Sequence, residues 1–149
     1  MFILWTIPFI IQAPLIIFDE WVFHRKRGLP RWERIGHPLD TLSVVLSLAL
    51  PAFFTYSPLF LKIYIALAIL SCLMVTKDEW VHKHHCPAAE HWVHAMLFLN
   101  HPILLTAAAF LWASGISWLV GFLQMQWSLG LIFMLYQTIY WNFLHVCDQ

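Results

Sequence analysis

Long apolar stretches alternate with short polar ones along this chain. Residues 1–18, 41–61 and 63–76 carry no charged side chain, and in residues 95–144 only His101 titrates near neutral pH. A helix that crosses a bilayer needs roughly 20 apolar residues, so the last stretch is long enough for two crossings. The pattern predicts five membrane-spanning helices, at about residues 2–20, 39–57, 59–77, 101–121 and 125–145. Turns on one side are expected at Thr55–Pro58 and near Gly121–Gln126.

The composition supports an integral membrane protein. Of the 149 residues, 61% are hydrophobic and 11% are charged, and the mean hydropathy is +0.72. These values lie far outside the range of soluble domains, and the length suits a single transmembrane domain, residues 1–149. The first apolar stretch lacks a basic start and a small-residue cleavage site, so we expect a retained helix. Balanced charge without a basic face argues against a nucleic-acid partner.

The basic residues predict the orientation in the bilayer. Seven of the eight Lys and Arg fall within Arg25–Arg34 and Lys77–Lys83, and Lys62 is the exception. Cytoplasmic loops carry an excess of Lys and Arg, so these two segments are expected in the cytoplasm. Five crossings then place the N-terminus outside and the C-terminus inside. With this topology all nine histidines and all eight acidic residues lie on the cytoplasmic side. Exclusion from lipid explains their absence from helix centres, but not their absence from the outer turns.

Two segments of the chain resemble each other. Residues 19–38 read DEWVFHRKRGLPRWERIGHP, and residues 78–102 read DEWVHKHHCPAAEHWVHAMLFLNHP. Both begin with Asp-Glu-Trp-Val, continue to Pro-x-x-Glu and reach a His-Pro that is expected to begin the next crossing. The sequence therefore predicts two repeated helical hairpins, at about residues 1–57 and 59–121, followed by a final helix at 125–145.

Carboxylates and histidines recur at helical spacing within these segments. Residues three or four apart share one face of a helix, and each candidate carboxylate has a histidine about one turn further on. Carboxylate and imidazole side chains on facing helices build di-iron and di-manganese sites in helical bundles, with roughly six to eight protein ligands. We therefore predict a site for two metal ions, with iron favoured and zinc or manganese as alternatives. The candidate ligands are Glu20, His24, Glu33, His37, Glu79, His82, His85, Glu90, His94, His101 and His145.

Two other functions remain open. A metal transporter or metal-delivery protein would need polar residues that continue across the membrane, and few are present beyond the cytoplasmic layer. A non-catalytic subunit or sensor could use a structural zinc site, but such sites are closed and four-coordinate. The three cysteines form no CxxC pair, so a thiolate metal site is not indicated.

The layout resembles the membrane-bound histidine-box di-iron enzymes, which include fatty-acid hydroxylases, desaturases and carotenoid hydroxylases. The resemblance covers residues 19–101 and His145, where histidines gather at the cytoplasmic ends of the predicted helices. The HxxHH boxes of that family are absent, and the nearest text is His82-Lys83-His84-His85. The resemblance implies that iron activates dioxygen and oxidises a lipid-soluble substrate, such as an acyl chain, an isoprenoid or a quinol. No nucleotide-binding fingerprint is present, so a separate electron donor protein is expected.

Overall fold

The chain folds into a bundle of helices. The computed structural model describes residues 2–77 and 86–145, and this part of the chain is helical and contains no strand. Five helical segments are long and apolar enough to cross a membrane. They are Phe2–Arg27, Arg31–Phe53, Pro58–Thr76, Ala88–Ala113 and Ser117–Leu144. The prediction of an all-α fold with five long apolar helices is confirmed.

Two of the five segments change their helical winding along their length. The first comprises a 3₁₀ turn η1 (Phe2–Thr6), α1 (Ile7–Asp19), a π-helical turn η2 (Glu20–His24) and α2 (Arg25–Arg27). The next three are α3 (Arg31–Phe53), α4 (Pro58–Thr76) and α6 (Ala88–Ala113). The last comprises α7 (Ser117–Ile139) and a second π-helical turn, η3 (Tyr140–Leu144).

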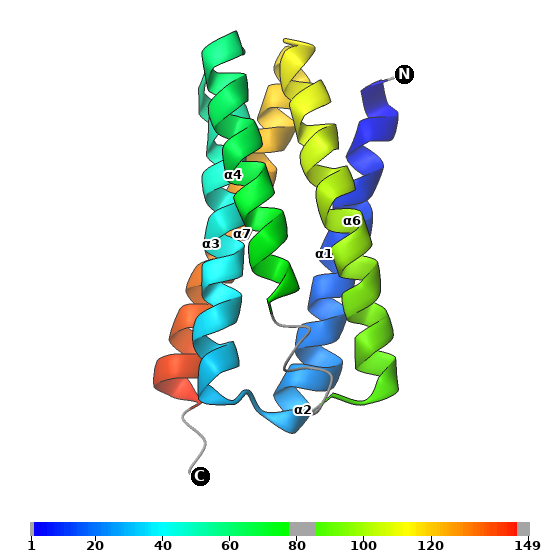
Figure 1. The fold of residues 1–149 in the computed structure, drawn as a ribbon, viewed down its shortest axis with the longest axis vertical. Coiled ribbons are helices and arrows are strands. Elements are labelled where there is room, and N and C mark those ends of the chain that lie inside the picture. Colours follow the sequence, from blue (N-terminus) through cyan, green and yellow to red (C-terminus); the bar gives the residue numbers. More distant parts are fainter. Residues whose placement is uncertain (1, 78–85, 146–149) are drawn as a thin grey trace.

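The helices pack side by side around a common axis (Figure 1). α1 lies against α6, α3 lies against both α4 and α7, and α4 and α6 also touch. The two termini lie at opposite ends of the bundle, as an odd number of long helices requires. We call the end that carries α2, η3 and the first turns of α3 and α6 the polar end. The opposite end, which carries the N-terminus, is the apolar end.

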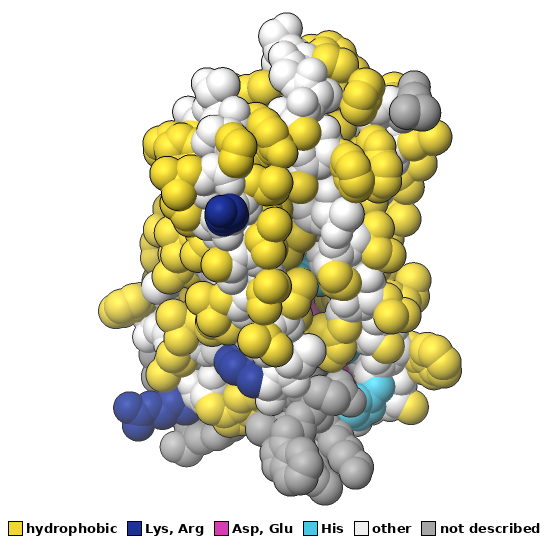
Figure 2. All heavy atoms as spheres, turned by 45° about the horizontal axis from the view of Figure 1, so that its top comes forward, with side chains coloured by type: hydrophobic (Ala, Val, Ile, Leu, Met, Phe, Trp, Pro, Cys, Tyr) yellow, Lys and Arg dark blue, Asp and Glu magenta, His cyan; other side chains and the backbone are white. Residues whose placement is uncertain are grey.

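An apolar core occupies the half of the bundle nearer the apolar end. Ala107, Ala108, Leu111, Leu119 and Leu123 are completely inaccessible to solvent, and small residues at this position let α6 approach its neighbours closely. The outer surface is also hydrophobic. Figure 2 shows a face on which hydrophobic side chains dominate and charged side chains are few. A chain that is apolar both inside and outside matches the composition expected of a bundle surrounded by lipid.

The helices α3 and α6 each begin directly after a proline, and both begin earlier in the sequence than the hydropathy pattern indicates. Pro30 and Pro87 have extended backbone immediately before the two helices. Glu33 and Glu90 are the third residues of these helices and are fully buried. A carboxylate in the first turn is stabilised by the partial positive charge of a helix N-terminus. The two Pro-x-x-Glu motifs thus form the same local structure, a helix start with a buried glutamate.

The expectation that each His-Pro begins a crossing was wrong. Pro38 lies inside α3 and Pro102 lies inside α6, so both helices extend well before these prolines. A proline inside a helix leaves the carbonyl four residues earlier without its usual N–H donor. For Pro38 that carbonyl belongs to Arg34, and Asn142 Nδ2 from η3 donates to it at 3.1 Å. This hydrogen bond compensates for the missing donor and ties the final helix to α3.

The two turns at the apolar end differ in how well the sequence predicts them. The first, between Phe53 and Pro58, lies where expected, and Ser57 Oγ caps α4 by accepting from Phe60 N. The second was expected near residues 121–126 but lies at residues 114–116, between α6 and α7. Gly115 has a φ of 64°, a left-handed conformation that ends helices and that glycine adopts without strain. The last helix is correspondingly longer than predicted.

Candidate metal centre

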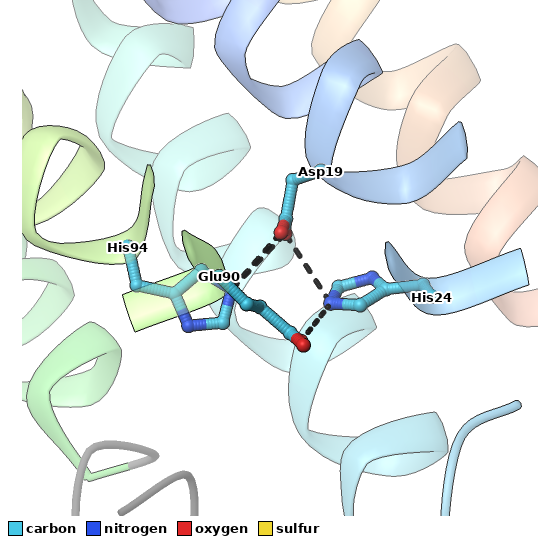
Figure 3. Close-up of side chains that lie close together, drawn as sticks. All are labelled: Asp19, His24, Glu90 and His94. Carbon is cyan, nitrogen blue, oxygen red and sulfur yellow. Dashed lines mark hydrogen bonds and ion pairs between the residues drawn. The ribbon is translucent and has the colours of Figure 1, made fainter. Parts of the chain in front are cut away.

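Four buried side chains from two regions of the sequence meet at the polar end. Asp19 ends α1, His24 ends η2, and Glu90 and His94 lie on the first turns of α6 (Figure 3). One potential ligand atom from each residue lies within 4.8 Å of those of the other three. None of the four residues is more than 6% exposed. This set of two imidazoles and two carboxylates is the centre of the site.

The distances inside this four-residue centre are short. His24 Nε2 lies 3.2 Å from Asp19 Oδ2 and 3.7 Å from Glu90 Oε1. His94 Nε2 lies 3.1 Å from Asp19 Oδ1 and 3.2 Å from Asp19 Oδ2. Asp19 therefore bridges the two imidazoles, and Figure 3 shows all four side chains converging on one point. Zinc and similar ions bind nitrogen and carboxylate ligands at roughly 2.0–2.2 Å, so small rotations of these side chains would suffice to hold an ion.

The π-helical turn explains how Asp19 joins the centre. In an α-helix, residues five apart point in clearly different directions, because one turn takes 3.6 residues. In η2 the wider winding brings Asp19 and His24, five residues apart, to the same side. Single π-helical turns inside α-helices occur frequently at functional sites. Sequence reasoning based on α-helical spacing missed Asp19 for this reason, although the repeated Asp-Glu-Trp-Val motif begins with it.

Glu20 lies behind His24 and orients it. Glu20 Oε2 lies 3.3 Å from His24 Nδ1, the ring nitrogen that faces away from Asp19 and Glu90. Tyr136 and Trp141 each donate a hydrogen bond of 2.8 Å to Glu20 Oε1. A proton on Nδ1 donated to Glu20 leaves the lone pair of Nε2 directed into the centre. Metal-binding histidines are commonly oriented by a carboxylate in this way.

Glu33 and Glu90 share one arginine. Arg27 Nη1 and Nη2 donate to Glu33 at 3.3 and 2.9 Å, and Nη2 also lies 2.9 Å from Glu90 Oε1. The glutamates that begin α3 and α6 are therefore joined through the end of α2. In this arrangement Glu33 pairs with Arg27 and lies outside the four-residue centre. Arg27 fixes the position of Glu90, which belongs to the centre.

The other predicted ligands lie in three different places. The His37 ring stacks on the His24 ring with centroids 4.8 Å apart, so it adjoins the centre. His101 lies two helical turns beyond His94 on α6, where its Nε2 is 3.0 Å from Ser71 Oγ. His145 stacks on Tyr140 at 5.3 Å, beyond η3. Glu79, His82 and His85 lie outside the described residues.

Cys86 lies next to Glu90 but is not one of the four residues of the centre. Burial, together with the negative charge of Glu90, raises the pKa of the Cys86 thiol to about 12. The donors of the four-residue centre are oxygen and nitrogen atoms.

The centre lies at one end of an elongated cavity. This cavity of about 620 Å³ runs between α1, α3, α6 and α7, and Asp19, His24 and His94 belong to its lining. Apolar side chains such as Ile16, Val44 and Leu97 form most of its wall. An ion held by the centre would therefore face an open apolar space. No protein-family model, curated protein or solved structure matches this chain.

Proposed function

We propose that the protein is an integral membrane metal-dependent oxidoreductase that acts on a lipid-soluble substrate at the cytoplasmic face of the membrane. The observation that carries this proposal is the position of the buried Asp19–His24–Glu90–His94 centre at the end of an apolar cavity. Five long apolar helices and the gathering of Lys and Arg at the polar end support the membrane location and its orientation.

The donors of the centre favour a metal over a simple network of ion pairs. Asp19, Glu20, Glu33 and Glu90 are all buried at the polar end, and Arg27 pairs with Glu33 and Glu90. Buried carboxylates are costly unless a cation accompanies them. A divalent ion at the centre would compensate Asp19 and Glu90 and would use the lone pairs of His24 and His94. Mixed carboxylate and imidazole donors suit iron, manganese and zinc.

We further propose two ions, with iron as the metal. The four-residue centre offers ligands for one ion. His37 adjoins it, and the predicted ligands Glu79, His82 and His85 belong to the second repeated segment. Together these residues would supply the roughly six to eight protein ligands of a two-metal site in a bundle.

The cavity distinguishes this proposal from its two alternatives. A structural zinc site is closed by four protein ligands, whereas three residues of this centre face an apolar space. An ion transporter needs a polar route through the membrane. Beyond the cavity, toward the apolar end, the bundle is filled by Leu111, Leu119 and Leu123, each completely buried. An apolar cavity that ends at metal ligands suits an apolar substrate.

The chain itself would position the reaction. Glu20 orients His24, Arg27 holds Glu90, and the apolar wall excludes water from the substrate chain. The iron, when bound, supplies the activation of dioxygen. In a hydroxylation one oxygen atom enters the substrate, and the other leaves as water with two protons and two electrons. A separate donor protein would supply the electrons at the polar end, where Arg25 and Lys26 lie on the surface.

Metal analysis of purified protein and matched variants tests the proposal. Protein loaded anaerobically with ferrous iron should retain the metal after desalting and should consume dioxygen when reduced. His94→Ala should remove most of the bound metal, because this ring is one of the two imidazoles of the four-residue centre. His91→Ala, on the same helix outside the centre, is the control and should retain it. Equal metal content in both variants, or a single zinc without dioxygen consumption, would contradict the proposal.

A further inference from the structure

Among the described residues, the cavity beside the centre is lined by acids and imidazoles but by no strong base. The titratable residues of its lining, all from the described part of the chain, include Asp19, Glu20 and Asp40, four histidines and Tyr136. No Lys or Arg among the described residues belongs to this lining. Two nearby cations already pair with carboxylates: Arg27 with Glu33 and Glu90, and Lys77, whose Nζ lies 2.6 Å from Oδ1 of the lining residue Asp40.

The cavity is long and narrow in the direction of the helices. On α6 its lining runs from His94 to Leu104, and on α3 it runs from His37 to Leu48. Ten or eleven residues of α-helix correspond to about 15 Å, at 1.5 Å per residue. The acidic residues gather near one end, Ile16, Val44 and Leu97 line the middle, and the uncharged Gln12 and Gln126 lie farther from the polar end. This shape suits a chain-like molecule with a polar group at one end.

The cavity opens sideways between α1 and α7. The exposed lining residues are Ala13 and Ile17 on α1, Trp21 in the adjoining turn η2, and Leu129 and Ile132 on α7. Lining residues from α3 and α6 are buried or partly buried. Because the outer surface here is apolar, a molecule dissolved in the membrane could enter without crossing water.

We propose that this cavity binds an amphiphile whose uncharged, hydroxyl-bearing head reaches the acids and imidazoles of the polar end while its apolar chain fills the remainder. This inference rests on the proposed function and narrows its substrate class. A fatty alcohol and an alkyl hydroquinone share the required chemistry.

Electrostatics excludes charged heads. An anionic head, such as a fatty-acid carboxylate, would meet Asp19 and Glu20 with no basic partner among the described lining residues, and a buried charge without a partner is strongly disfavoured. With an ion held at the centre, its charge and those of Asp19 and Glu90 compensate one another, so a charged head of either sign would add a buried charge without a partner. A hydroxyl group instead donates to carboxylate oxygens or imidazole nitrogens and carries no charge to compensate.

Aromatic side chains favour the hydroquinone among the uncharged heads. Trp21 of η2, Phe98 of α6, and Phe133 and Tyr136 of α7 all line the cavity. Aromatic rings attract one another in stacked or edge-to-face arrangements, by about 0.5–1.5 kcal/mol beyond their burial. We expect the hydroquinone to bind more tightly than the alcohol of equal chain length.

Competition binding to the purified full-length protein tests this inference. A tritiated alkyl hydroquinone, kept anaerobic, is bound to protein in detergent and displaced by dodecanol, dodecanoate or dodecylamine. Both metal-loaded and metal-free protein are used. We expect saturable binding to the metal-loaded protein, displacement by dodecanol, and at least tenfold weaker displacement by dodecanoate and dodecylamine. Dodecanoate that competes as well as dodecanol, or the absence of saturable binding, would overturn the inference.

Two tryptophan substitutions on α3 locate the binding site. Val44 lines the cavity, whereas Leu46, two residues away, is 49% exposed on the outer surface and does not line it. Val44→Trp should weaken hydroquinone binding at least tenfold, and Leu46→Trp should leave it within twofold. Thermal unfolding of both variants checks that each is folded. Equal effects would overturn the assignment. The two proposals can fail separately. If the protein binds the hydroquinone but retains no metal after loading, this inference stands and only the proposed function is refuted.

Discussion

The two ends of the bundle are built by opposite means. At the apolar end, Leu111, Leu119 and Leu123 pack without access to solvent, and the backbone carbonyl of Phe54 accepts from Trp112 Nε1. At the polar end, carboxylates and imidazoles such as Glu20, Glu90 and His24 are buried almost as deeply. Apolar packing stabilises a fold directly, whereas buried charge stabilises it only when it is compensated. The difference indicates that the apolar end holds the bundle together and that the polar end serves a function.

The largest effect is expected at the apolar end. Leu111→Ala removes a completely buried side chain, and such truncations lower the free energy of unfolding by about 2–5 kcal/mol. Metal content per folded molecule should stay unchanged. Chemical unfolding in detergent, paired with metal analysis, measures both quantities. Loss of metal without loss of stability would show that the two ends are not independent.

Metal binding should stabilise the polar end selectively. Free metal at a hundredfold excess over its dissociation constant stabilises a folded protein by about 2.7 kcal/mol. We expect this gain in wild type and in Leu111→Ala. It should be absent in Asp19→Asn, which loses the carboxylate that bridges both imidazoles. Thermal unfolding with and without metal measures the gain, and a full gain in Asp19→Asn would contradict the role of that residue.

Glu20→Gln tests whether Glu20 orients the ligand His24 or binds the metal itself. Carboxylates behind a metal-binding histidine typically contribute about 10–100-fold to metal affinity. We expect a loss of this size and little change in the number of ions bound, because His24 itself remains. Tyr136→Phe removes one of two hydrogen bonds to Glu20 and should have a smaller effect. A lower number of bound ions in Glu20→Gln would make Glu20 a ligand instead.

The smallest effect is expected from a polar group at the apolar end. Tyr64 donates a hydrogen bond of 2.5 Å to the carbonyl of Leu105. Tyr64→Phe should lower the free energy of unfolding by about 1 kcal/mol, the usual net value of one hydrogen bond. Metal affinity should not change. A large loss of metal in this variant would mean that the apolar end controls the geometry of the centre.

The sequence predicts the helices better than their ends. Apolar runs located all five helices, because membrane-length apolar segments have few alternatives to a helix. Hydropathy reports apolar composition and not helix formation, so the polar first turns of α3 and α6 were missed. Pro30 and Pro87 could have marked them, since helices often begin directly after or at a proline. Ser114-Gly115 was likewise an overlooked signal for the end of α6.

The candidate site was partly predictable. Spacing of three or four residues identified His24, Glu90 and His94, which the structure brings together. It did not identify Asp19, because the sequence does not reveal that η2 winds as a π-helix. Spacing also could not show that Glu20 contacts the outer ring nitrogen of His24, Nδ1, and does not face the centre. Such distinctions depend on the packing of Tyr136 and Trp141, which are more than a hundred residues away.

The bridging position of Asp19 has a consequence for how the protein is made. Its partner His94 lies 75 residues later in the chain, and the sequence between them contains two long helices, α3 and α4. While the ribosome has synthesised only α1 to α4, Asp19 and His24 have neither Glu90 nor His94 beside them. The centre can form only after α6 has entered the bundle. Any metal must therefore be acquired late, by a chain whose first four long helices are already present.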